Sequence, residues 1–396
     1  MSDDKVVIVG AARTPIGGFM GELSSVSASE LGTHAITGAI DNAAISAEQI
    51  EDVVMGCVLQ AGLGQAPARQ ASLGAGVPAS SGATTINKMC GSGMQACIFA
   101  HDQLIAGSNE VMVAGGMESM SNAPYLIDKA RGGVRLGNAR VSDHMFLDGL
   151  QDPFGSGGLM GVFAEDCAEH YQFTRDAQDE YAIRSLTRAT RASDDGSFNN
   201  ETVSVKASTR KGELTVAQDE QPRLARPDKI AQLKPAFRTN GTVTAANSSS
   251  LSDGAAALVM MRESAAQRRA LQPRARIVGH STFAAEPQWF TTAPIGAINT
   301  LLEKIGWQRE QVDLFEINEA FAVVTMAAMR DLDLPEDAVN VHGGACALGH
   351  PIGASGARIL VTLLNALDRY DLARGVATLC IGGGEATAIA VERIRA

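Results

Sequence analysis

Residues 111–119, VMVAGGMES, predict a buried strand that ends in glycines and one glutamate. Residues 378–386, TLCIGGGEA, have the same pattern near the other end of the chain. Residues 50–56 and 311–317 match in a similar way, because each is an acidic turn followed by a strand. A Gly/Ser turn that opens an apolar helix comes before each of the two strands that end in glycines. The order strand, turn, helix, strand therefore recurs at an offset of about 260–270 residues, which indicates an internal repeat.

The repeat predicts the fold class and the domain organisation. Two copies of an alternating β/α unit imply an α/β protein with two similar, helix-covered halves. We expect an N-terminal half over 1–120, to which 248–271 returns, and a C-terminal half over 272–396. Residues 121–247 are richer in charge and irregular sequence, so we expect an inserted loop domain that binds a ligand. Sites in such sheets form where loops leave the strand ends, so the halves should share one cleft.

The bulk composition is that of an ordinary globular protein. The chain has 396 residues, of which 45% are apolar, and a net charge of −11, which argues against a nucleic-acid partner. No apolar run reaches about 18 residues, so we expect no membrane span. The six cysteines form no CxxC pair, and the first residues have the features of neither a signal nor a transit peptide. We therefore expect a reducing, cytoplasmic location.

Cys90 is the candidate nucleophile. It lies in the turn 87–93, NKMCGSG, between an expected strand over 83–86 and an expected helix that ends at Ala106. A thiol at a helix N-terminus faces the positive end of the helix dipole and free N–H groups, so we expect its pKa to be lowered. The alternative is a small residue that fills a turn, a role that Ser or Ala would also serve.

His350 is the candidate base for that thiol. It lies in residues 349–353, GHPIG, where Pro351 restricts the turn and holds the imidazole at the head of a helix over 353–367. From there the ring can take the proton of Cys90. The alternative is a structural histidine.

Cys380 is the candidate acid/base for a substrate carbon. It ends a strand beside Gly382 and two further glycines, which allow a backbone N–H group to point at an oxyanion. A second thiol there can remove a proton from the carbon next to a thioester carbonyl and return it. The alternatives are a buried strand cysteine and a zinc site formed with Cys346 and His350.

Asn318 opens the segment 318–321, NEAF. We expect it to cap a helix over 319–332. Its amide can also hold a water molecule or a carbonyl oxygen, and the two roles are compatible.

Five motifs together resemble the thiolase family, and the resemblance covers essentially the whole chain. They are NxxCGSG at 87–93, GGMESMS at 115–121, NEAF at 318–321, GHPxGxSG at 349–356 and CxGGG at 380–384. The resemblance implies a five-layered α-β-α-β-α core of two similar halves plus a loop domain.

By the same resemblance, Cys90 is acylated, His350 activates it, and Cys380 transfers the α-proton. One oxyanion hole would consist of His350 and a water molecule on Asn318. The other would consist of the N–H groups of Cys90 and Gly382. No metal is expected.

The resemblance also implies that coenzyme A binds along the loop domain, as a substrate and product and not as a tightly bound cofactor. The expected contacts are Arg223 at the adenine and phosphates, Leu233 and Phe237 along the way, Ser249 at the pantetheine, and Leu150, Met160 and Phe321 in the tunnel. Family members usually form dimers or dimers of dimers. We expect a homotetramer that associates through residues 125–143.

The expected activity is the reversible condensation of two acetyl-CoA molecules to acetoacetyl-CoA and CoA. The closest alternative is a degradative thiolase for longer 3-ketoacyl-CoA. Bulky Trp289 and Phe290 replace smaller family residues, and Phe290 should shorten an acyl pocket, whereas Leu159, in place of the usual His, should open it. A ketoacyl synthase would carry a second histidine in place of Asn318. A non-enzymatic lipid-binding relative would lack Cys90 or His350.

Overall fold

A ten-stranded sheet runs through the molecule. The computed structural model describes residues 4–155, 157–210 and 212–395. The strand order is β12-β13-β14-β11-β1-β10-β5-β3-β4, and the short β2 pairs with β10. The strands are β1 (Val6–Arg13), β2 (Gly17–Gly18), β3 (Asp52–Gly56), β4 (Gly82–Ile86), β5 (Val111–Ser119), β10 (Ser252–Arg262), β11 (Ala275–Ala284), β12 (Leu314–Ile317), β13 (Arg374–Ile381) and β14 (Glu385–Arg393).

The sheet consists of two half-sheets with the same strand pattern. In the N-terminal half, β3 is parallel to β4 and β5, and β10 is antiparallel to β5 and β1. In the C-terminal half, β12 is parallel to β13, and β14 is antiparallel to β13 and β11. An isolated parallel bridge from Phe315 to Val339 takes the place of β4. Only Val7 and Ile8 of β1 pair with β11, so the halves meet along a short seam. The internal repeat is confirmed.

The pairing of strands corrects the register of that repeat. Gly56, at the end of β3, pairs with Gly116, and Ile317, at the end of β12, pairs with Thr378. Thr378 is therefore the counterpart of Gly116, and Cys380 is the counterpart of Glu118. The matched glycines in the sequence aligned Glu118 with Glu385 instead, which is wrong by five residues. The reason is that Gly116 lies inside a strand, whereas Gly383 and Gly384 form the turn after β13 with positive φ.

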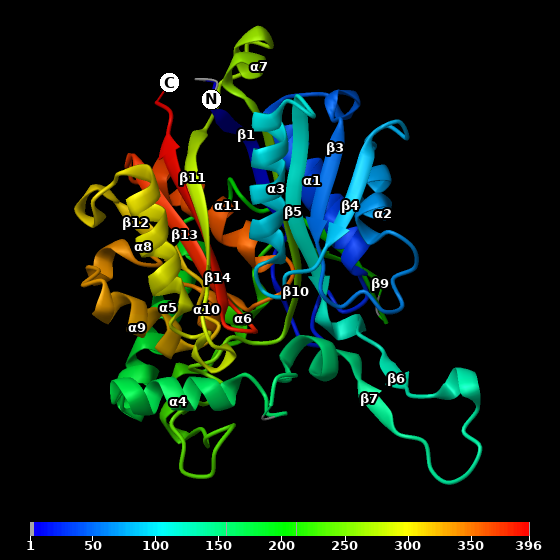
Figure 1. The fold of residues 1–396 in the computed structure, drawn as a ribbon, viewed down its shortest axis with the longest axis vertical. Helices are drawn as coiled ribbons and strands as arrows, with labels where there is room; N and C mark the ends of the chain where they lie inside the picture. Colours follow the sequence, from blue (N-terminus) through cyan, green and yellow to red (C-terminus); the bar gives the residue numbers. More distant parts are fainter. Residues whose placement is uncertain (1–3, 156, 211, 396) are drawn as a thin grey trace.

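Five layers make up the core (Figure 1). Helices α3 (Ser92–Ala106) and α11 (Ser355–Arg369) pack against each other between the two half-sheets. Helices α1 (Ala28–Ala43) and α2 (Pro67–Gly74) cover the outer face of the N-terminal half. Helix α8 (Ala293–Ile305), with α9 (Ala322–Asp331) beside it, covers the outer face of the C-terminal half. The expected α-β-α-β-α arrangement is confirmed.

Both faces of each half-sheet are buried, so the side chains on both faces of a central strand are apolar. In β10, Leu258 and Met260 pack in the central cluster with α3 and α11, whereas Val259 and Met261 pack in the outer cluster with α1. Side chains of a strand point alternately to its two faces, so a strand between two helical layers must be apolar throughout. At the centre, Gly356 lets α11 approach α3 closely, since a Cβ there would lie 2.4 Å from the backbone N of Met94.

The middle of the chain lies partly below the core in Figure 1 and partly against the outer face of the N-terminal half, where Val205 and Val216 join the apolar cluster. It contains the hairpin β6 (Tyr125–Ile127) and β7 (Val141–Asp143), which extends away from the rest, and the helices α4 (Gly161–Tyr171) and α5 (Arg175–Asp194). Further elements are the π-helix η4 (Phe146–Leu150), β8 (Val205–Thr209), β9 (Gly212–Val216) and α6 (Glu220–Leu224). No helix in the described parts of the chain is both long enough and apolar enough to cross a bilayer.

Short helices complete the structure. They are α7 (Glu263–Arg268), α10 (Ala345–Leu348), and the 3-10 turns η1 (Ala47–Gln49), η2 (Met120–Asn122), η3 (Ala130–Gly132), η5 (Pro227–Gln232), η6 (Pro287–Trp289), η7 (Arg309–Gln311) and η8 (Glu336–Ala338).

Candidate active site

A pocket of about 130 Å³ lies where loops of the two halves meet the middle segment. Both halves and the middle segment contribute to its wall, which is mostly apolar. The lining residues are Cys90, Met120, Gly149, Leu150, Leu159, Met160, Gly161, Phe237, Ser248, Ser249, Ser250, Leu251, Phe290, Ala320, Phe321, His350, Ile352 and Gly382. The structure thus brings Cys90, His350 and Gly382 together, although they are far apart in the sequence.

Cys90 lies in the turn between β4 and α3. Ser92 shapes this turn, because its hydroxyl accepts the N–H of Lys88 at 2.8 Å and donates to the carbonyl of Met89 at 2.6 Å. Met89 has a positive φ of 48°, a conformation that places the following thiol at the entrance to the helix. The sequence predicted this strand, turn and helix correctly.

The expected lowering of the Cys90 pKa is wrong for this structure. Burial in an apolar wall raises the pKa of the Cys90 thiol to about 11, and hydrogen bonds from the N–H groups of Gly382 and of Cys90 itself offset only part of that rise. The free energy cost of removing a thiolate from water is larger than the stabilisation that the helix end and the two N–H groups give it. The thiol therefore carries its proton at neutral pH.

His350 faces the pocket with a free nitrogen. Its Nδ1 lies 2.6 Å from Ser355 Oγ, and the Ser355 hydroxyl donates its only proton to the carbonyl of Pro351 at 3.0 Å. Both contacts are satisfied when the Ser355 oxygen accepts a hydrogen bond from Nδ1–H, because the Pro351 carbonyl can only accept. A neutral imidazole that is protonated at Nδ1 has a lone pair at Nε2. Nε2 is buried and has no hydrogen-bond partner among the described residues.

Burial also sets the charge of His350. It lowers the pKa of the ring to about 3, and the positive charge of Arg358 lowers it further in the same direction. The imidazole is therefore neutral at physiological pH and can accept a proton. Ser355, which contacts Nδ1 of the ring, was missed in the sequence, although it lies only five residues after His350.

Cys380 ends β13 beneath the pocket. It is fully buried and packs with the aromatic side chains of Phe290 and Phe321. Burial raises the pKa of the Cys380 thiol well above its ordinary value, and a negative charge on the Cys90 sulfur would raise it further. Cys380 is not among the residues that line the pocket itself.

Asn318 does not cap a helix. Helix α9 begins at Ala322, because the preceding segment is extended and pairs with residues 247–249: the N–H of Ala322 donates to the carbonyl of Asn247 at 2.8 Å, and that of Ser249 to the carbonyl of Ala320 at 3.0 Å. Asn318 is fully buried, and neither atom of its side-chain amide has a hydrogen-bond partner among the described residues. The expected cap is therefore wrong, and the amide is free for another ligand.

Glu118 fastens the catalytic loop of the C-terminal half to the N-terminal half. Its buried carboxylate accepts the N–H groups of Val58 and Leu59 at 3.0 Å each and that of Gly353 at 2.9 Å. Gly353 is three residues after His350, so Glu118 positions the imidazole loop. Burial raises the pKa of Glu118 to about 7, although these N–H donors lower it.

Glu319 fastens the same loop to the middle segment. Its buried carboxylate accepts the hydroxyls of Tyr181 and Ser185 on α5, at 2.8 and 2.7 Å, and the N–H of Cys346 at 3.0 Å. The Asn340 amide adds a fourth hydrogen bond at 2.9 Å. The sequence placed Glu118 and Glu319 in motifs but did not reveal these roles, because every partner comes from a distant segment.

Most of the residues expected to contact coenzyme A line the pocket, but two do not. Phe237, Ser249, Leu150, Met160 and Phe321 are in its wall. Arg223 is on the surface of α6, where it forms an ion pair of 2.6 Å with Glu22, and Leu233 follows η5. Contact of these two residues with coenzyme A stays a prediction.

The unusual residues of the sequence have different positions. Leu159 and Phe290 both line the pocket, and Phe290 packs edge-to-face on Phe321 with ring centroids 6.4 Å apart. Trp289 is outside the pocket and packs on His170.

The alternative zinc site does not form. The Cys346 sulfur contacts the backbone carbonyl of Glu319, and Cys380 packs among aromatic rings. Among the described residues, Cys346, His350 and Cys380 do not gather as a ligand set.

Comparison with known proteins identifies the family. Family models for the thiolase N-terminal domain and the thiolase C-terminal domain match residues 6–264 and 271–393. The chain belongs to the thiolase family. It is similar to a probable acetyl-CoA acetyltransferase of Dictyostelium discoideum, with 47% identity over 99% of this chain and 94% of that protein.

Solved structures show the same fold. An acetyl-CoA acetyltransferase of Bacillus anthracis superposes with a TM-score of 0.96 and 42% identity, over 99% of both chains. The Acat5 thiolase of Ascaris suum in complex with coenzyme A superposes with a TM-score of 0.93 and 42% identity, over 98% of this chain and 100% of that one.

Proposed function

We propose that the protein is an acetyl-CoA C-acetyltransferase, which condenses two acetyl-CoA molecules to acetoacetyl-CoA and CoA in a reversible reaction through an acyl-cysteine. The observation that carries the proposal is one pocket lined by the Cys90 thiol, the His350 ring and Gly382, with the Cys380 thiol buried beneath it. Full-length relatives named acetyl-CoA acetyltransferase support the choice of substrate.

In the first half-reaction, Cys90 takes the acetyl group. The Cys90 sulfur attacks the thioester carbonyl of acetyl-CoA while His350 Nε2 takes the thiol proton. Because the thiol is protonated and the imidazole is neutral before binding, proton transfer accompanies the attack. The tetrahedral intermediate collapses, the C–S bond to CoA breaks, and the imidazolium returns the proton to the CoA sulfur.

In the second half-reaction, Cys380 first gives its proton to His350 Nε2, and the resulting Cys380 thiolate then removes a proton from the methyl carbon of a second acetyl-CoA. The enolate carbon attacks the carbonyl of the acetylated Cys90, a C–C bond forms, the bond to the Cys90 sulfur breaks, and the His350 imidazolium returns its proton to that sulfur. Buried polar groups are nearly always hydrogen-bonded, so we assign two donors to the enolate oxygen: the Nε2–H of His350, once the ring holds the proton from Cys380, and a water molecule on the free Asn318 amide. The N–H groups of Cys90 and Gly382 donate hydrogen bonds to the oxyanion of the tetrahedral intermediate on Cys90.

The size of the pocket favours a short acyl group. Its volume of about 130 Å³ is well below the roughly 300–1,000 Å³ of pockets for drug-sized ligands. Phe290 fills the space that a longer chain would need, whereas Leu159 leaves the wall apolar. The degradative alternative with longer 3-ketoacyl-CoA substrates requires Phe290 to move.

We also propose that residues 121–247 form a coenzyme A-binding loop domain, with Arg223 and Leu233 on the path of the nucleotide. Five expected contact residues in the pocket wall support this proposal. The relative that was solved with coenzyme A supports the choice of ligand.

For assembly, we propose a homotetramer through the β6–β7 hairpin, and for location the cytoplasm. The hairpin exposes apolar side chains, among them Tyr125, Ile127 and Leu136. The six free cysteines agree with a reducing compartment. Light scattering after size exclusion, on the wild type and on Leu136→Asp, tests the assembly, since the variant should shift from tetramer to dimer.

The activity is tested by assaying thiolysis with a chain-length series of 3-ketoacyl-CoA substrates, together with condensation of acetyl-CoA. We expect kcat/KM to be highest for acetoacetyl-CoA and to fall for longer chains. We expect Phe290→Ala to raise the ratio of longer to short substrates by about 10-fold or more. A wild type that prefers long chains would support the degradative alternative, and no turnover of any 3-ketoacyl-CoA would overturn the proposal.

A further inference from the structure

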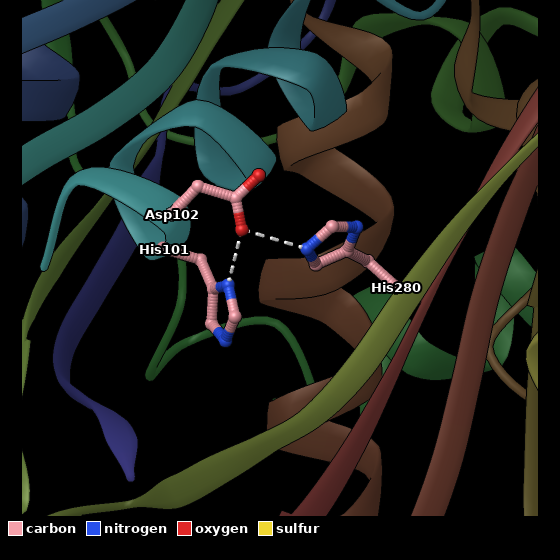
Figure 2. Close-up of side chains that lie close together, drawn as sticks. All are labelled: His101, Asp102 and His280. Atoms are coloured by element: carbon pink, nitrogen blue, oxygen red, sulfur yellow. Dashed lines mark hydrogen bonds and ion pairs between the residues drawn. The ribbon is translucent and has the colours of Figure 1, made fainter. Parts of the chain in front are cut away.

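A second cluster of ligating side chains lies between the two halves, outside the pocket. His101 and Asp102 are on α3, and His280 is on β11 (Figure 2). Asp102 Oδ1 lies 2.9 Å from His101 Nδ1 and 2.9 Å from His280 Nε2. Within the described part of the chain, this is the one group of three or more His, Cys, Asp or Glu residues whose ligand atoms all lie within 4.8 Å of one another.

We propose that His101, Asp102 and His280 bind a divalent transition-metal ion such as Zn²⁺. Two imidazole nitrogens and one carboxylate oxygen form a donor set that suits Zn²⁺ and related ions, and they leave a fourth position for water. The ligands come from a helix of the N-terminal half and a strand of the C-terminal half. The bound ion therefore links the two halves.

Binding an ion requires the two N···O distances to widen and the N···N distance, which is at most 4.8 Å, to reach about 3.3 Å. Two ligand atoms at about 2.0–2.1 Å from a tetrahedral ion lie about 3.3 Å apart. The two N···O distances of 2.9 Å therefore widen by about 0.4 Å when the ion enters. The ion takes the place of the two N–H protons, which move to His101 Nε2 and His280 Nδ1 through solvent, so both imidazoles stay neutral. The rings are already nearly perpendicular, at 79°, with centroids 5.0 Å apart.

Exposure and charge decide whether an ion reaches the cluster. The Asp102 side chain is 55% exposed, which gives an open route, whereas the two histidine side chains are each only 16% exposed and are held in place. The neighbouring cation is Lys304, which opposes an ion, but its ammonium is bound to the backbone carbonyl of His280 at 2.9 Å and not to the ring.

Equilibrium dialysis against Zn²⁺ tests the site on the full chain. The protein carries Cys90→Ser and Cys380→Ser, so that the catalytic thiols do not bind zinc. Asp102→Asn and His280→Gln are compared with His34→Gln, a half-buried histidine on α1 that is not in the cluster. We expect one Zn²⁺ per chain, an affinity that falls by more than about tenfold in Asp102→Asn and His280→Gln, and no change in His34→Gln.

Thermal unfolding with and without Zn²⁺ gives the second readout. The unfolding midpoint should rise with Zn²⁺ in the parent and in His34→Gln but not in Asp102→Asn, a substitution at an exposed position that keeps the side-chain shape. Failure of the parent to bind Zn²⁺, or equal binding by all variants, would overturn the proposal, and the cluster would then be a hydrogen-bonded contact between the halves.

Discussion

The two halves contact each other at two equivalent crossings, and at each crossing the turn before a helix of one half meets the end of a strand of the other half. The proposed chemistry takes place at one of these crossings. At the first, the turn before α3, which carries Cys90, meets the end of β13, which carries Cys380: a Cβ on Gly91 would lie 2.3 Å from the Ile381 side chain. At the second, the turn before α11 brings Gly353 to Glu118 at the end of β5, where the Gly353 N–H donates to the carboxylate at 2.9 Å. Cys90 and Gly353 each precede their helix by two residues, and Cys380 is the counterpart of Glu118.

The comparison shows how a repeated framework produces one active site. The framework sets where a helix-entry turn meets a strand end. One crossing then supplies two thiols, and the other uses a carboxylate to hold the loop of His350. Substitutions at the reacting crossing should abolish chemistry without unfolding the protein, whereas substitutions at the holding crossing should reduce stability first.

The largest expected effect is that of Cys90→Ser on turnover. Loss of the thiol removes the acyl acceptor, so we expect the overall rate in the steady-state condensation assay to fall by at least about 10³-fold. The unfolding midpoint should stay close to that of the wild type, which circular dichroism can check. A fall of less than tenfold would place the nucleophile elsewhere.

Cys380→Ser should separate the two half-reactions. We expect condensation to fall by about 10²–10⁴-fold, because a hydroxyl is a poor acid/base in this position, while acylation of Cys90 stays within a few fold. Stopped-flow release of CoA measures the first step, and formation of acetoacetyl-CoA measures the second. Equal losses in both steps would contradict the division of roles.

Glu118→Gln tests the holding crossing, with Glu385→Gln as its matched control. The amide cannot accept all of the N–H groups that the carboxylate accepts, so we expect the free energy of unfolding to fall by about 1–3 kcal/mol. Glu385 has a side chain that is 35% exposed and pairs with Lys88. Its substitution should cost less than about 1 kcal/mol in urea-induced unfolding. Similar losses in both variants would contradict the difference between the crossings.

The raised pKa of Cys90 predicts the pH dependence of its alkylation. The thiolate reacts, and the pKa of about 11 means that the thiolate fraction at pH 7 is small and grows about tenfold per pH unit. Alkylation by iodoacetamide, followed by peptide mapping at Cys90, should accelerate through pH 7–9 without levelling off. A plateau reached by pH 8 would show that the thiolate is already formed in the free enzyme.

Local patterns made much of this site predictable. Cys90, His350 and Cys380 each stand in a short glycine-rich segment, and glycine and proline are the strongest local markers of turns in a sequence. The repeat then indicated that the loops meet. The matched glycines misplaced its register because a glycine inside a strand and a glycine in a turn look alike in sequence.

The remaining features depend on contacts between distant segments. Glu118 and Gly353 are 235 residues apart, and no sequence pattern near either residue indicates that the two are in contact. Asn318 was assigned to a helix cap because an Asn before an apolar stretch is typical of one, but pairing with residues 247–249 keeps the segment extended. The pKa of Cys90 depends on an apolar wall built from three parts of the chain.

Intact-mass spectrometry after brief incubation with acetyl-CoA tests most directly whether the crossing of Cys90 and Cys380 is the reacting one. The wild type and Cys380→Ser should each gain one acetyl group as a hydroxylamine-labile thioester, and Cys90→Ala should gain none. A Cys90→Ala protein that still carries an acetyl group on a thiol would contradict the account.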